Sequence, residues 1–135
     1  MVFADPPYSG VHYSRFYHAL ETVTHGAEFE PEGRGRYPSI ENRPSSAFSQ
    51  KSNARNAARE LLTTCASKRA TLVLTFPTAG ASNGLDASDF MVLGASLFST
   101  IRVEEVQTDF STLGGNKKHR AARRVCSESI ICFVP

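Results

Sequence analysis

The first ten residues place the strongest constraint on the fold, because an apolar run stops abruptly at two prolines. Met1 to Ala4 is followed by Asp5, Pro6, Pro7 and Tyr8. The apolar run predicts a buried strand, which ends here because proline fixes φ and has no N–H to donate to a sheet. Ligands of open α/β sheets bind at the carboxyl ends of the strands. The sequence therefore predicts a strand that presents Asp5 and Tyr8 at a ligand-binding edge.

The Asp-Pro-Pro-Tyr turn carries groups that suit a planar ligand bearing an amine. The stiff turn leaves its carbonyls free to accept hydrogen bonds, Asp5 adds a charged acceptor, and Tyr8 adds a flat aromatic face. A ring stacked on Tyr8 would share its amine hydrogens between Asp5 and the Pro6 carbonyl. A plain proline-rich turn after a strand is the equal alternative for four residues alone.

The segment Asp5-Pro6-Pro7-Tyr8 resembles the catalytic DPPY motif of the S-adenosylmethionine-dependent, adenine-N6-specific DNA methyltransferases of bacteria and phages. The resemblance continues, in the order that the family has, through residues 13–21, 33–37, 72–77, 82–85 and 111–115. It implies that S-adenosylmethionine is the cofactor and that the methyl group goes to an adenine flipped out of double-stranded DNA. All four motif residues are then catalytic, and Asp5 also contacts the cofactor.

The resemblance also implies that residues 1–135 are the C-terminal catalytic part of such an enzyme. The family's Gly-rich cofactor loop and its target-recognition segment precede DPPY, whereas this chain starts at DPPY. Gly33-Arg34-Gly35 follows no predicted strand and opens no predicted helix, so it does not replace that loop. We therefore expect a partial Rossmann-like sheet that needs an N-terminal half in cis or in trans. An inactive gene remnant and a non-enzymatic DNA-binding module remain alternatives, and the biological role (restriction-modification, phage or regulation) stays open.

Apolar spacing divides the first half of the chain into two helices and a loop. A helix is predicted from about residue 11 to 25, with an aromatic and apolar face that includes Leu20 and Val23. Residues from about 26 to 50 have prolines and glycines but no apolar period, which predicts a long loop. The clearest helix has Ser52 as its expected cap and a small apolar face: Ala54, Ala57, Ala58, Leu61, Leu62 and Cys65.

The second half predicts a parallel strand followed by an antiparallel closing hairpin. Residues 71–76 form a nearly continuous apolar run, as in a central strand covered on both faces, and should pair in parallel with the first strand. Asp86 or Ser88 is expected to cap a helix with four buried residues: Phe90, Leu93, Leu97 and Phe98. Residues 101–110 and 129–134 are predicted to be the hairpin strands, which gives an α/β fold.

Candidate DNA contacts lie in four places. The family resemblance points to Tyr13 and Arg15, and the long loop brings Arg34 and Arg36 together with Tyr37. Asn83 follows the second strand, where a plain turn is the equal alternative. Lys117 and Lys118 belong to the densest basic run, 117–124, where phosphate contact competes with a solvated loop.

Composition restricts the class of protein. The formal charge is only +2, so DNA binding must depend on local clusters of charge. The three cysteines lack a C-x-x-C spacing, which favours free thiols in a reducing cytoplasm. His119, Cys126 and Cys132 do not fit a zinc pattern, so no metal is expected. No apolar stretch approaches the roughly 20 residues of a membrane span, and we expect no membrane contact and a cytoplasmic protein.

Overall fold

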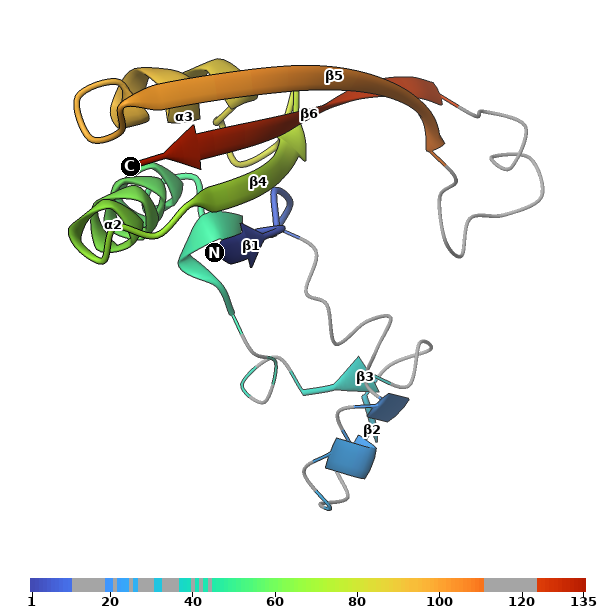
Figure 1. Cartoon of the computed structure of the whole chain (residues 1–135). Coiled ribbons are helices and arrows are strands. Elements are labelled where there is room, and N and C mark those ends of the chain that lie inside the picture. Colours follow the sequence, from blue (N-terminus) through green and yellow to red (C-terminus); the bar gives the residue numbers. More distant parts are fainter. Residues whose placement is uncertain are drawn as a thin grey trace.

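The chain folds around a four-stranded mixed sheet in the order β1-β4-β6-β5 (Figure 1). This computed structural model describes residues 1–10, 19–20, 22–24, 26, 31–32, 37–39, 41, 43, 45–110 and 124–135. The strands are β1 (Val2–Ala4), β4 (Leu72–Pro77), β5 (Thr100–Phe110) and β6 (Arg124–Val134). Only β1 and β4 are parallel, and β6 is antiparallel to both of its neighbours. The predicted α/β class, the parallel pair and the closing hairpin are confirmed.

The core lies between one face of this sheet and two helices, α2 (Ala54–Ser67) and α3 (Ala87–Gly94). Alternate residues of β4 point into it, so that Leu72, Leu74 and Phe76 are fully buried. Four of the six residues on the predicted face of α2 are buried, and the other two, Ala57 and Leu61, are half-buried: Ala54, Ala58, Leu62 and Cys65 are the buried ones. The predicted cap is wrong, because Asn53 occupies the N-cap position and makes no side-chain cap bond. Its amide instead donates to Gln50 Oε1 at 2.6 Å.

The third helix begins at the predicted cap and ends earlier than predicted. Asp86 Oδ1 accepts the Asp89 backbone N–H at 3.1 Å, and Asp89 Oδ2 accepts the Asp86 N–H at 3.1 Å, which completes a capping box. The helix stops at Gly94, and the N–H groups of Leu97 and Phe98 both bond to the Gly94 carbonyl in the turn that follows. Phe98 still reaches the core, with its ring centroid 5.2 Å from that of Phe133.

The predicted burial of the first strand is wrong, because β1 is an edge strand. Met1 and Phe3 are 94% and 67% exposed, since β1 pairs with β4 alone among the described strands. The expectation that β4 is covered on both faces is also wrong. Its alternate residues Val73 and Thr75 are only half-buried, because the buried residues of α2 and α3 join the cluster on the opposite face. One sheet face therefore lacks a helical layer among the described residues.

Two other expectations for the first half need correction. Ala19–Leu20 and residues 22–24 are helical, but Leu20 and Val23 are 64% and 81% exposed, so the predicted apolar face is not buried there. Residues 11–18 lie outside the described part of the chain. The predicted loop contains a short antiparallel pair, β2 (Pro31–Glu32) and β3 (Tyr37–Pro38), and a 3-10 turn, η2 (Ala47–Ser49). Elements of two or three residues are too short to give a hydrophobic period.

Gly94 sits where α3 comes closest to β6, and adding a methyl group there should destabilise the fold. A Cβ at this position would lie 2.6 Å from Cε1 of Phe133. We expect Gly94→Ala to lower the free energy of unfolding by about 1–3 kcal/mol, measured by urea denaturation, because overpacking outweighs the better helix propensity of alanine. Gly10→Ala is the matched control, since nothing lies within 4 Å of its Cβ. Equal stability of the two variants would contradict this packing.

The Asp86 cap should make stability depend on pH. The hydrogen bond from Ser88 is the main cause that lowers the pKa of Asp86 below its ordinary value of 3.8. The stabilisation is therefore present above that value and is lost as the pH falls through the lower folded pKa. Asp86→Ala should cost about 1 kcal/mol at neutral pH in urea denaturation. Asp86→Asn keeps a capping oxygen, so it should retain stability while losing this acid dependence; an unchanged pH profile would contradict the assignment.

Candidate functional site

The carboxyl ends of β1 and β4 form a rim on which the predicted residues gather. Because the two strands are parallel, they end at the same edge of the sheet. Thr75 Oγ1, on β4, donates to Asp5 Oδ1 at 3.0 Å. The loop after β4 returns to the same place, where Asn83 N and Ser82 Oγ each donate to the Tyr8 carbonyl at 3.3 Å. The loop after β4 therefore shares an edge of the sheet with Asp5 and Tyr8.

Asp5 is an oriented and accessible carboxylate. Its side chain is exposed, and one oxygen is fixed by the hydroxyl of Thr75. The other oxygen, Oδ2, has no hydrogen-bond donor among the residues that the structure describes. The neighbouring Pro6 is buried, and no described residue donates to its carbonyl. Asp5 and Pro6 thus each have one acceptor to which no described residue donates.

The ring of Tyr8 is held by the core. It packs edge-on against Phe76, with ring centroids 6.0 Å apart and planes at 77°. Phe76 is itself fully buried and lies against Phe90 at a centroid distance of 4.8 Å. Tyr8 remains half-buried, so part of its surface faces the rim. A side chain fixed in this way presents a pre-organised aromatic surface to a planar ligand.

Asn83 has a structural role in the same rim. It is only 2% exposed, its amide donates to the Phe48 carbonyl at 2.9 Å, and its Oδ1 accepts the Leu85 N–H at 3.1 Å. These two bonds engage both ends of the side-chain amide inside the fold, and the contact between Asn83 and DNA stays a prediction. The burial favours the alternative of a structural turn, which ties η2 to the loop after β4.

The other predicted DNA contacts lie outside the described residues: Tyr13, Arg15, Arg34, Arg36, Lys117 and Lys118. Arg43 belongs to the predicted long loop of residues 26–50. Its Nε donates to the Pro38 carbonyl at 2.8 Å, so this side chain takes part in the structure of that loop. Thr75 is the residue of this rim that sequence analysis missed. It is the only hydroxyl-bearing residue of β4, a signal that could have indicated a polar contact at the strand end.

Among the described residues, the cysteines and acidic side chains give no sign of a second kind of site. Cys65 and Cys132 are free thiols, and burial raises the pKa of the Cys65 thiol, which disfavours the reactive thiolate. Across the described ranges, no group of three histidine, cysteine or acidic side chains is arranged to hold a metal ion. The same part of the chain contains no helix with the length and apolar character needed to cross a membrane. The rim at Asp5 is thus the candidate site that the geometry favours.

If Asn83 supports the rim, its removal should affect folding before it affects binding. We expect Asn83→Ala to lower the free energy of unfolding by about 1–3 kcal/mol, because the Phe48 carbonyl and the Leu85 N–H lose their partner in a buried place. Ser82→Ala is the matched control: the side chain is exposed, and its loss should cost no more than about 0.5 kcal/mol. An Asn83→Ala variant with unchanged stability and impaired DNA binding would restore the ligand-contact hypothesis.

Comparison with known proteins leaves the geometry of the rim as the main guide to function. No protein-family model, curated protein or solved structure matches this chain. The functional argument therefore depends on the Asp5–Tyr8 turn, on the contacts that hold it, and on the motif resemblance of the sequence. A fold class alone does not specify a function, whereas an oriented carboxylate beside an aromatic ring restricts the chemistry.

Proposed function

We propose that this chain is the target-base part of an S-adenosylmethionine-dependent DNA adenine-N6 methyltransferase. The observation that carries the proposal is the Asp5 carboxylate, held by Thr75 at 3.0 Å on the rim formed by two parallel strands. The adjacent Pro6 carbonyl and the Tyr8 ring complete a set that matches the edge and the face of adenine. The resemblance to the DPPY motif implies that these residues are catalytic.

The mechanism requires the exocyclic amine of adenine to become a better nucleophile. Its lone pair is delocalised into the ring, which makes it a poor nucleophile in the free base. Asp5 Oδ2 and the Pro6 carbonyl accept its two hydrogens, which draws the lone pair out of conjugation and aims it away from the ring. Tyr8 stacks on the base, which must leave the duplex because N6 is inaccessible while the base is stacked. Positioning thus supplies most of the rate enhancement.

The described residues could bind only part of the cofactor. S-adenosylmethionine would supply a methyl group on a positively charged sulfur, and the exposed oxygen of Asp5 suits a cationic neighbour. The described residues contain no Gly-x-Gly-x-x-Gly turn between a strand and a helix that would cradle the rest of the molecule. The proposal therefore includes an N-terminal half, in cis or in trans, that completes the cofactor site.

The sheet supports both the methyltransferase assignment and the need for an N-terminal half. The last strand, β6, lies antiparallel between β4 and β5, as expected of a partial Rossmann-like methyltransferase sheet with an antiparallel closing strand. At the other edge, β1 has one neighbour and carries the exposed side chains of Val2 and Phe3. An apolar edge of this kind is a liability for a free protein and is suited to pairing with further structure. A covering N-terminal half would remove that liability.

The decisive experiment measures transfer of a labelled methyl group from S-adenosylmethionine to duplex DNA that contains adenine. The purified chain is assayed alone and mixed with the N-terminal half of a similar enzyme. We expect transfer in the mixture and its loss in Asp5→Ala. Thr75→Val should reduce the rate roughly 10- to 100-fold, because a hydrogen bond to a charged group is worth about 1.5–3 kcal/mol. Thr100→Val, on the exposed edge strand β5, is the matched control and should leave the rate unchanged.

Each alternative predicts a different result in the same experiment. Activity retained in Asp5→Ala would refute the catalytic assignment. DNA binding that does not respond to cofactor, even with the N-terminal half present, would favour a non-enzymatic DNA-binding module. A chain that circular dichroism finds unfolded, with no transfer in either assay, would favour an inactive gene remnant.

A further inference from the structure

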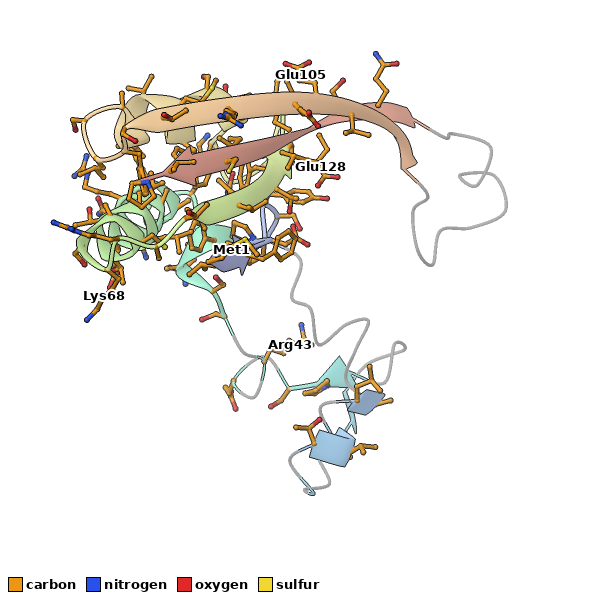
Figure 2. All side chains as sticks on the ribbon, in the orientation of Figure 1. Met1, Arg43, Lys68, Glu105 and Glu128 are labelled. Carbon is orange, nitrogen blue, oxygen red and sulfur yellow. The ribbon has the colours of Figure 1, made fainter. Side chains whose placement is uncertain are left out.

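Charge is unevenly distributed over the described surface. Residues 51–69 contain one acid, Glu60, and five cations: Lys51, Arg55, Arg59, Lys68 and Arg69. The neighbouring strands β5 and β6 carry exposed or half-buried acids instead, and Figure 2 shows Glu105 and Glu128 on that hairpin, away from Lys68 at the end of α2. A chain with a formal charge of +2 thus carries five cations and one acid on the segment 51–69, which contains α2 and its flanking residues. Such a local field attracts anions.

Three of these cations recur every fourth residue, from the turn before α2 into its first half. Lys51, Arg55 and Arg59 follow a four-residue spacing, which places them on one face at intervals of about 6 Å along the axis. Lys51 precedes the helix proper, but the Ala54 N–H donates to the Gln50 carbonyl at 2.8 Å, so the intervening residues follow a helical turn. All three side chains are exposed. We call this set the basic ridge.

The basic ridge begins at the rim of the candidate site. A Cβ at Gly84 would lie 3.2 Å from Cε of Lys51, so the lysine side chain lies against the loop that bonds to Tyr8. Arg55 is partly neutralised, because its NH1 bonds to Asp89 Oδ1 at 2.6 Å. Lys51 and Arg59 make no ion pair with any residue in the described ranges. Two exposed charges on the ridge therefore remain available for an anionic ligand.

We propose that the basic ridge binds the phosphodiester backbone of a nucleic-acid duplex. A membrane surface is disfavoured, because an interfacial helix needs exposed large apolar side chains and none lies between residues 51 and 69. A row of cations with regular spacing is instead complementary to the repeated charges of a nucleic-acid strand, and arginine binds phosphate through paired N–H groups. This binding does not depend on methyl transfer and reads no sequence.

The test is the salt dependence of binding to a short fluorescent DNA duplex, measured by anisotropy with the full chain and no cofactor. We expect Arg59→Gln to make the slope of log K against log salt concentration less steep by about 0.9 and to weaken binding roughly fivefold at about 0.1 M salt. Arg59→Lys keeps the charge and should retain the slope. Arg102→Gln is the matched control, because Arg102 is an exposed arginine without an ion pair to a described residue and lies on β5.

Three outcomes would overturn the proposal. The first is an Arg59→Gln variant that binds with the affinity and salt slope of the unmodified chain. The second is an equal loss in Arg59→Gln and Arg102→Gln, since net charge and not the ridge would then govern binding. The third is a chain that binds vesicles of anionic phospholipid but not the duplex at low salt. Because no cofactor is present, a failure of the methyl-transfer assay leaves each of these results interpretable.

Discussion

The parallel pairing of β1 with β4 is the constraint on which the site depends. β1 has only three residues, and its Val2 N–H reaches the Thr71 carbonyl at 2.8 Å from a segment far along the chain. The same alignment brings Thr75 to Asp5 and the loop after β4 to Tyr8. Parallel strands need a long crossover, so the whole segment between them must be closed before these contacts form. The site therefore forms only when β1 has paired with β4.

Local patterns in the sequence predict the elements, and non-local pairing decides their exposure. The spacing of apolar residues predicts α2, β4 and the hairpin because helix and strand periods are properties of short windows. An apolar run such as that of β1 is the same for a central strand and for an edge strand, so its exposure could not be derived from its own residues. The rim position of Asp5 and Tyr8 was predictable because topology fixes where strands end. The role of Thr75 was not, since it requires the register between two strands.

Asn83 illustrates how backbone hydrogen bonding overrides composition. An asparagine before a glycine, in a turn, is expected to face solvent, yet its burial satisfies the Phe48 carbonyl and the Leu85 N–H. Gly84 then adopts φ +81°, and Lys51 lies against it. One buried amide thus joins η2 to the loop after β4, against which Lys51 lies. Its structural role has a consequence for function, because it fixes the start of the basic ridge at the rim.

The two proposals together resolve an electrostatic conflict in the candidate site. An exposed carboxylate at the rim repels the phosphates of DNA, yet a carboxylate is the acceptor that an adenine amine needs. In the proposed complex, separation removes the conflict. The basic ridge starts beside the rim and continues along α2, so phosphates would meet cations while the neutral base would meet Asp5. Exposed charges are screened over about 10 Å at 0.1 M salt, and the ridge extends about 12 Å from Lys51 to Arg59 at 1.5 Å per residue. The attraction along α2 can therefore hold a duplex without cancelling the local field of the carboxylate.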